Sequence, residues 1–298
     1  MAEQLARLPD GTEICHETFG DPGDPAMLLV MGLGCPMGWW SVEFCELLVQ
    51  RGFFVIRFDN RDTGRSTRFR GERVSRRQLV RAFLRRPVAV PYSMSALADD
   101  AFGLLDDLDL ERAHVAGISM GGMIAQTMAI ARPARIASMT SIMSTTGARR
   151  VGWQHPKLFP SLLAPAGNAR ESYVRRSLRS ATLMRSPGYD LDTDYVIARA
   201  EETFDRGWSS SGVVRQMLAV LTQPDRTRDL QHLTMPVCVI HGLNDPMVHR
   251  SGGQATAAGI PGAQLVTIPG MGHDMPRALY VTIIDAITRT ARRASVSH

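Results

Sequence analysis

The sequence Gly-Ile-Ser-Met-Gly at residues 117–121 constrains the fold of this chain more than any other feature. It places Ser119 between two glycines, directly after a short apolar run at residues 113–116 and before a helical pattern at residues 123–131. A serine in a G-x-S-x-G sequence lies on a strained turn between a strand and a helix, where only small neighbours fit. Such a turn exposes the hydroxyl, which is a poor nucleophile until it is held still beside a base. We therefore interpret Ser119 as a candidate nucleophile rather than as part of a glycine-rich helix start.

Apolar runs and helical patterns alternate along most of the chain. Residues 26–31, 53–58 and 136–142 are typical of buried strands, and two further strands are predicted at residues 237–241 and 264–268. This alternation predicts an α/β fold in which helices flank a mostly parallel sheet. An antiparallel hairpin around an Asp-Gly turn is predicted near the N-terminus, before the alternation begins.

Residues 147–229 interrupt the alternation, because they carry helical patterns and no apolar run typical of a buried strand. A helical insertion between two strands predicts a cap over the ends of the strands. The α/β core is then formed by residues 1–146 together with residues 230–298. The insertion is rich in aromatic residues, which indicates an apolar pocket or, as the simpler alternative, the internal packing of the cap.

A second insertion, residues 65–91, lies within the core and is rich in arginine. It holds nine arginines and one glutamate, a charge of +8, so the rest of the chain carries −3 of the total of +5. Ser75 is predicted to cap a short helix with an apolar face and an arginine face, and Pro87 is predicted to end it. The alternatives are a solvated helix against the cap, a gate for anionic or lipid-like substrates, and a weak contact with a membrane surface. Because the positive charge is confined to one segment and no nucleic-acid-binding motif is present, nucleic acid is not an expected partner.

Composition excludes several other classes of protein. No run of about 18 apolar residues is present, so no integral membrane segment is expected. The first residues lack the apolar core of a signal peptide, and a cytoplasmic location is therefore expected. The four cysteines show no metal-ligand spacing and are predicted to be reduced core residues rather than, for example, a Cys35–Cys45 disulfide. Neither a metal nor another cofactor is expected, and the sequence does not indicate an oligomeric state.

A serine nucleophile needs a base within hydrogen-bonding reach and a carboxylate that orients the base. His273 follows the strand predicted at residues 264–268 in a glycine-rich loop, which delivers its imidazole to the carboxyl edge of the sheet. Asp245 follows the strand predicted at residues 237–241 and reaches the same edge. It is preferred over Asp274, because neighbouring residues in a loop usually point apart. The other seven histidines lie in less suitable places: His16, His114, His155, His232, His241, His249 and His298.

The oxyanion that forms when a carbonyl is attacked needs backbone N–H groups already aimed at it. Met120 follows the nucleophile at the start of a helix, so its amide is one expected donor. Gly32 and Gly34 follow the strand predicted at residues 26–31 and let the backbone aim an amide into the site. We expect Leu33, between these glycines, to supply the second donor. The alternative is an ordinary turn between a strand and a loop.

Together these motifs make the chain similar to the serine members of the α/β-hydrolase superfamily over nearly its whole length. It resembles the branch that contains aclacinomycin methylesterase, because a methionine precedes the oxyanion glycine and because of the form of residues 59–66. The resemblance implies hydrolysis of a carboxylic ester through an acyl-enzyme, by a triad in the chain order Ser119, Asp245 and His273. The same two backbone amides are implied as oxyanion donors. The resemblance rests on residues 30–32, 59–66, 117–121, 245–246 and 269–273.

The expected substrate is a small-molecule ester, small to medium in size and apolar. A lactonase or a cofactor-free perhydrolase would use the same triad, although perhydrolases often carry proline where this chain has Gly34. A ligand-binding protein without turnover is the third possibility, which a complete triad disfavours. Dehalogenases and epoxide hydrolases of similar fold use an aspartate nucleophile, and serine at position 119 disfavours both.

Overall fold

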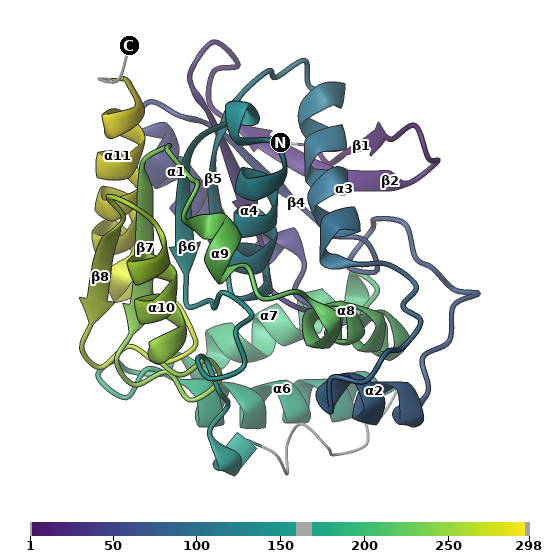
Figure 1. The fold of residues 1–298 in the computed structure, drawn as a ribbon. Coiled ribbons are helices and arrows are strands. Elements are labelled where there is room, and N and C mark those ends of the chain that lie inside the picture. The colour runs from purple at the N-terminus through teal and green to yellow at the C-terminus, as the bar shows by residue number, and fades with distance from the viewer. Residues whose placement is uncertain (1, 159–168, 296–298) are drawn as a thin grey trace.

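The computed structural model describes residues 2–158 and 169–295, in which the strands form one eight-stranded sheet. The strand order is β1-β2-β4-β3-β5-β6-β7-β8, with helices on both sides (Figure 1). β1, β2 and β4 pair antiparallel, and all other pairs are parallel. The predicted α/β class and the N-terminal hairpin are therefore confirmed. The strands are β1 Gln4–Arg7, β2 Glu13–Phe19, β3 Ala26–Val30, β4 Phe54–Phe58, β5 Ala113–Ile118, β6 Ile136–Ile142, β7 Val237–Gly242 and β8 Gln264–Ile268.

Two layers of helices cover the sheet. α3 and α4 pack on one face, and α1 and α11 pack on the other. In β3, Leu28 and Val30 face α3 and α4, whereas Met27 and Leu29 face α1 and α11. Central strands buried on both faces explain the continuous apolar runs of the sequence. The helices outside residues 147–229 are α1 Val42–Val49, α2 Arg76–Phe83, α3 Met94–Asp107, α4 Met120–Ala131, α10 Ser251–Gly259 and α11 Tyr280–Ser295.

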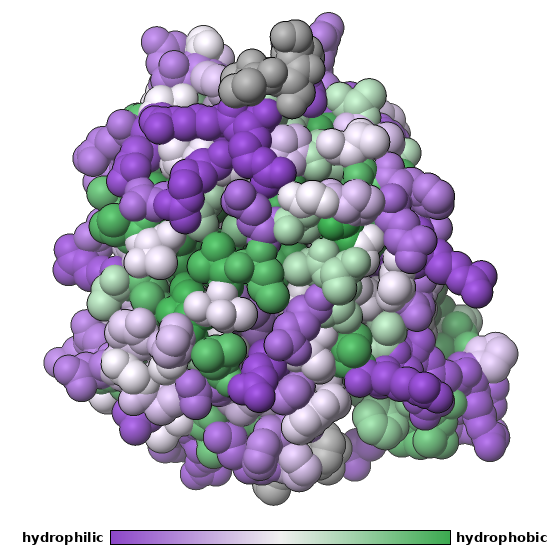
Figure 2. Space-filling model, turned by 60° about the vertical axis from the view of Figure 1, so that its left-hand side comes forward, coloured by the Kyte–Doolittle hydropathy of each residue, from purple (hydrophilic) through white to green (hydrophobic). Residues whose placement is uncertain are grey.

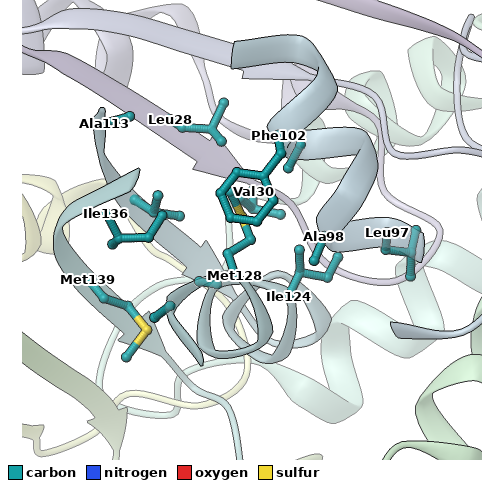
Figure 3. Close-up of a cluster of buried hydrophobic side chains, with 14 of the residues drawn as sticks. Leu28, Val30, Leu97, Ala98, Phe102, Ala113, Ile124, Met128, Ile136 and Met139 are labelled. Atoms are coloured by element: carbon teal, nitrogen blue, oxygen red, sulfur yellow. The ribbon is translucent and has the colours of Figure 1, made fainter. Parts of the chain in front are cut away.

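The core between β3 and the α3–α4 pair is filled by large apolar side chains. Figure 3 shows Phe102 of α3 near Met128 of α4 and Val30 of β3. Phe102 is 1% exposed, and the other two side chains are fully buried. Burying side chains of this size contributes about 1.5–3 kcal/mol each. This packing fixes α4 against the sheet, and with it the turn that joins β5 to α4.

Residues 147–229 lie between β6 and β7, and we call them the cap segment. Its helices gather at one end of the sheet, where β5 meets α4 (Figure 1). α6 packs on α7, and α8 packs on α2. Phe159, one of the aromatic residues of this segment, lies outside the described residues. The helices described in the cap segment are η3 Pro156–Leu158, α6 Arg170–Met184, α7 Thr193–Asp205, α8 Ser210–Thr222 and α9 Thr227–Leu230.

The arginine-rich segment contains α2, which begins after Ser75 as the sequence predicts. Ser75 Oγ accepts a hydrogen bond from Gln78 N at 3.2 Å, and Gln78 Oε1 accepts one from Ser75 N at 2.8 Å. This capping box satisfies backbone donors at the start of the helix. The predicted apolar face, however, does not pack closely on the cap segment: Val80 is 57% exposed and Phe83 62% exposed. The buried residue of α2 is Ala82, and the helix packs on α8. The small side chain of an alanine lets two helices approach closely.

The described surface is mostly hydrophilic, and the cysteine thiols are free. Figure 2 shows hydrophilic side chains over most of the visible face, with hydrophobic side chains gathered near its middle. In the part of the chain that the structure describes, no helix is both long and apolar enough to cross a bilayer. All four cysteines are free, so Cys35 and Cys45 do not form a disulfide.

Candidate active site

Ser119 lies on a sharp turn between the end of β5 and the start of α4. Its backbone has φ +55° and ψ −115°, a conformation that costs a residue with a side chain about 1–3 kcal/mol. The flanking glycines allow the turn, because a Cβ on Gly117 would lie 2.1 Å from Gly121 O. A Cβ on Gly121 would lie 2.1 Å from Val30 O. The two glycines therefore let β5, α4 and β3 approach closely enough to hold Ser119 in this conformation.

The imidazole of His273 lies between Ser119 and Asp245. Its Nε2 is 3.1 Å from Ser119 Oγ, and its Nδ1 is 2.7 Å from Asp245 Oδ2. A carboxylate oxygen accepts, so Nδ1 carries the proton and Nε2 is free to accept the proton of the serine hydroxyl. The structure thus brings together three side chains that lie far apart in the sequence, from the ends of β5, β7 and β8. This arrangement is able to activate a serine hydroxyl as a nucleophile.

Asp245 is held by its own loop, and its side chain is fully buried. Its second oxygen accepts hydrogen bonds from Met247 N at 2.8 Å and from Val248 N at 2.9 Å. Hydrogen bonds from backbone amides stabilise a buried carboxylate in its charged form. Asp245 is therefore held in position to orient the imidazole of His273.

His241 is a neighbour of Asp245 that sequence reasoning treated only as structural. Its Nε2 lies 2.8 Å from Val248 O and 3.5 Å from Asp245 Oδ2. A backbone carbonyl only accepts, so Nε2 carries the proton. Burial lowers the pKa of His241, which keeps its ring neutral at pH 7. No local pattern in the sequence points to this contact, because His241 lies in β7, where a spacing of four residues does not bring side chains together as it does in a helix.

Asp274, the alternative acid, points away from His273. It accepts a hydrogen bond from Ser186 of the cap segment, and burial raises its pKa. The loop around His273 is itself fastened to the chain after α6, because His273 N donates to Met184 O at 2.8 Å and Gly272 N donates to Ser186 Oγ at 2.8 Å. No motif in the sequence predicts that the cap segment holds this loop.

The turn at residues 31–34 lies beside Ser119, since a Cβ on Gly32 would be 3.5 Å from Ser119 Cβ. Among the hydrogen bonds of the described chain, Gly34 N donates to Gln216 Oε1, whereas Leu33 N has no acceptor. Met120 is the first residue of α4, so its amide has no acceptor within the helix. Among the hydrogen bonds of the described residues, Gly32 N and Leu33 N both lack an acceptor, so either N–H is available and the role of Leu33 stays a prediction.

The remaining histidines of the described chain serve other contacts. His114 lies within β5 and its Nδ1 is 2.8 Å from Ser138 Oγ. Burial, helped by the charge of Arg112, lowers the pKa of His114 to about 4. His249 stacks on Trp153 with ring centroids 4.2 Å apart. His16, His155 and His232 lie away from Ser119 in β2, the cap segment and the chain before β7, and His298 is outside the described residues.

No group of three or more histidine, cysteine or acidic side chains in the described residues is arranged to hold a metal ion. Burial raises the pKa of the Cys15, Cys35 and Cys45 thiols to about 12. These thiols are therefore protonated at neutral pH and are poor nucleophiles. Ser119 is the better candidate for covalent chemistry.

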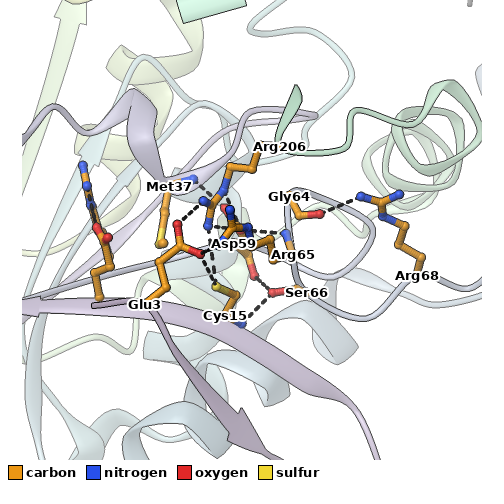
Figure 4. Close-up of polar contacts among 11 residues, drawn as sticks. Glu3, Cys15, Met37, Asp59, Gly64, Arg65, Ser66, Arg68 and Arg206 are labelled. Atoms are coloured by element: carbon orange, nitrogen blue, oxygen red, sulfur yellow. Dashed lines mark hydrogen bonds and ion pairs between the residues drawn. The ribbon is translucent and has the colours of Figure 1, made fainter. Parts of the chain in front are cut away.

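Residues 59–66, which the sequence marks only as a motif, join the core to the cap segment. Figure 4 shows Asp59 between the backbone amides of Met37 and Arg65 and the guanidinium of Arg206. The Arg206–Asp59 distance is 2.7 Å, and Glu3 also contacts Arg206. Because Arg206 directly follows α7, this buried ion pair ties the cap segment to the core.

Comparison with known proteins places the chain in a family. A family model for the α/β hydrolase fold matches residues 25–276. The chain belongs to the α/β hydrolase fold family. This α/β hydrolase is 29% identical over 310 residues to rhodomycin D methylesterase DauP of a Streptomyces species, which covers 96% of this chain and 97% of the relative. The predicted resemblance to the methylesterase branch is thereby confirmed.

Other relatives of this α/β hydrolase are named for reactions other than methyl ester hydrolysis. It is 28% identical over 245 residues to 3-oxoadipate enol-lactonase 2 of Acinetobacter baylyi, covering 80% of this chain and 78% of that protein. A solved meta-cleavage product hydrolase from Pseudomonas fluorescens superposes with a TM-score of 0.75 at 18% identity, over 98% of each chain. At that identity the superposition shows the shared fold alone.

Proposed function

We propose that this α/β hydrolase is a serine hydrolase that cleaves carboxylic esters through an acyl-enzyme intermediate. The observation that carries the proposal is the continuous hydrogen-bonded line from Ser119 Oγ through His273 to Asp245. Its curated relative DauP is a methylesterase, which supports an ester as the substrate. The mechanism needs no cofactor, because the nucleophile, the base and the oxyanion donors all come from the chain.

In the proposed mechanism, Ser119 Oγ attacks the ester carbonyl while its proton moves to His273 Nε2. Asp245 stabilises the imidazolium that forms, and it remains ionised throughout. The N–H groups of Leu33 and Met120 stabilise the oxyanion, each contributing about 3 kcal/mol to the transition state. Nε2 then protonates the leaving alcohol, and the acyl group stays on Ser119. Water, activated by the same imidazole, releases the acid in a second half-reaction.

We further propose that residues 147–229 act as the cap of this site and favour an apolar substrate. Tyr173, Phe204 and Trp208 form an aromatic cluster in the cap, with 4.6 Å between the rings of Tyr173 and Trp208. Trp208 also lines a small hollow together with Gly34 of the turn beside Ser119. Trp208 is the member of the cluster that lines this hollow, and an indole wall favours apolar acyl or alcohol groups because it removes them from water. Small to medium apolar esters are therefore the substrate class that we propose.

The Ser119→Ala variant tests the mechanism. Its kcat for p-nitrophenyl acetate is expected to fall by about 10⁶-fold, because the triad acts as a unit. Ser211→Ala is the matched control, because Ser211 is an exposed serine of α8 that bonds only to Ser209 Oγ. Unchanged turnover by purified Ser119→Ala protein would refute the assignment, as would equal losses in both variants.

A lactonase is the second candidate, and the enol-lactonase relative favours it. Ring opening of a lactone uses the same attack, but the leaving alkoxide remains attached to the acyl group. A panel of lactones and open-chain esters with matched acyl lengths separates the two functions by their kcat/KM. Adding hydrogen peroxide and a carboxylic acid to the same assay detects peracid, the product of the perhydrolase alternative.

A further inference from the structure

The cap segment reaches the turn beside Ser119 through α8, whose Val213 packs against Gly34 and whose Gln216 forms hydrogen bonds there. Gln216 Oε1 accepts a hydrogen bond from Gly34 N at 2.7 Å. Its Nε2 donates to Arg61 O and to Thr63 Oγ1, both at 2.8 Å. A backbone N–H only donates and a backbone carbonyl only accepts, so these partners fix the orientation of the amide. The side chain is 0% exposed and both of its N–H donors are used.

Three consecutive peptide planes form the turn at residues 31–34, and each one is held by a hydrogen bond. Asn60 Nδ2 donates to the carbonyl oxygen of residue 31 at 3.0 Å. Cys35 N donates to the carbonyl oxygen of residue 32 at 3.3 Å. Gln216 holds the third plane through the amide of residue 34. The N–H of Leu33 belongs to the middle plane, so its direction depends on both neighbouring planes, because each peptide unit is rigid.

α8 is a firm support for this contact. Arg215, the residue before Gln216, forms a buried ion pair with Asp62 at 2.7 Å. A Cβ on Gly212 would lie 2.5 Å from Asp62 O, so the backbones of α8 and of residues 59–66 are in close contact. The position of Gln216 is therefore set by the docking of the whole helix on the core.

We propose that Gln216 is a positioning residue for the oxyanion hole, and that the cap segment completes the catalytic site through it. Gln216 occupies the N–H of Gly34 and leaves the N–H of Leu33 aimed at the oxyanion. The inference rests on the proposed esterase function. It adds a residue from the cap segment to a site whose other groups all come from the core.

Gln216→Met tests the proposal, because methionine has similar volume and no hydrogen-bonding amide. We expect kcat for p-nitrophenyl acetate to fall about 10-fold to 100-fold, less than the loss of a whole oxyanion donor. KM is expected to change less than about 3-fold. The inhibition constant of phenylboronic acid, which forms a tetrahedral adduct with a serine nucleophile, is expected to rise by the same factor as kcat falls. A purely structural role would not move these two quantities together.

Two further variants serve as rescue and control. Gln216→Glu keeps an oxygen that accepts from Gly34 N. The kcat of Gln216→Glu is therefore expected to exceed the kcat of Gln216→Met and to be closer to the unmodified value. Thr63→Val removes one partner of Nε2 and leaves the bond to Gly34, and it is expected to change kcat less than about 3-fold. Where Gln216→Met does not fold, Gln216→Asn replaces it, because its amide is one methylene too short to hold all three partners.

The outcomes separate this inference from the proposed function. Unmodified protein that neither hydrolyses the ester nor binds phenylboronic acid would refute the proposed function itself. A different result would overturn only the role of Gln216. In it, the unmodified protein is active, and a folded Gln216→Met or Gln216→Asn variant has the same kcat and the same boronate affinity. Equal losses in Thr63→Val and Gln216→Met would also overturn it.

Discussion

Ser119 owes its reactivity in this account to the backbone that holds it. Its positive φ is maintained because Gly117 and Gly121 let three elements meet with almost no space between them. Ser251 Oγ also lies 2.9 Å from a histidine nitrogen, but at Ser119 the imidazole at 3.1 Å is in turn held by the Asp245 carboxylate. Substitutions of single residues around Ser119 therefore test the proposed chemistry most directly.

Asp245→Asn is expected to lower kcat by about 10⁴-fold, because an asparagine amide favours the imidazole tautomer that cannot accept the serine proton. Asp274→Asn is the matched control, because Asp274 is the sequence neighbour of His273 but bonds to Ser186 instead. Its kcat is expected to stay within about 10-fold of the original value. Steady-state hydrolysis of p-nitrophenyl acetate measures both, and the reverse order of losses would contradict the assignment of the acid.

His114 is expected to make the free energy of unfolding depend on pH. Its pKa falls from 6.5 to about 4 on folding, so the unfolded chain binds a proton that the folded chain does not between these values. Stability is then lost as pH falls from about 6.5 to about 4, by at most about 3 kcal/mol. Urea unfolding at pH 7 and pH 4.5 measures the loss. Between pH 7 and pH 4.5, the free energy of unfolding of a His114→Gln variant is expected to fall less than that of the unmodified protein. An equal fall in the two proteins would contradict the role of His114.

Residues with a strong local signal could be predicted from the sequence. A serine between glycines after a strand, and a histidine in a glycine-rich loop after a late strand, each identify their own position. His241 and Gln216 carry no such signal, because their importance depends on which atoms the fold brings to Asp245 and Gly34. The roles of Ser119, Asp245 and His273 in catalysis stay predictions until the variants above are measured.

Among the helices and strands, the type of each element and the residue at which it begins were easier to predict than the face that it buries. α2 begins after Ser75 as expected, because a capping box is a local interaction among four residues. It lies against α8 of the cap segment, as the first of the alternatives has it, but Val80, Phe83 and Leu84 of its apolar face are exposed, since the position of α8 decides which side is covered. A short helix with many arginines has no periodicity strong enough to indicate its partner.

The contact between α8 and the core gives a stability prediction. Arg215→Met is expected to lower the free energy of unfolding by about 3–5 kcal/mol, because it leaves the Asp62 carboxylate buried without its charged partner. Arg170→Met is the matched control, since Arg170 pairs with Glu201 and Asp205 on the surface. Its effect on the free energy of unfolding is expected to be much smaller, because ion pairs exposed to solvent contribute little to stability. Urea unfolding at pH 7 compares the two, and a larger loss for Arg170→Met would contradict the structure.

At the scale of the whole molecule, the site arises because the parallel strands β5, β7 and β8 end at one edge of the sheet. Chain order and strand prediction are sufficient to place Ser119, Asp245 and His273 at this edge. The attachment of the cap segment was not predictable, because Arg206, Arg215 and Gln216 reach acids and amides more than 140 positions away. Long-range pairs of this kind leave no periodic trace in a single sequence.

The proposed mechanism requires that Ser119 carry the acyl group during turnover. Rapid acid quenching during hydrolysis of p-nitrophenyl acetate, followed by peptide mapping with mass spectrometry, tests it most directly. We expect an acetyl group of about 42 Da on the peptide that contains Ser119, and none on that peptide in the Ser119→Ala variant. Sustained turnover with the acetyl group on another residue, or with no acylated peptide at any quench time, would contradict the account.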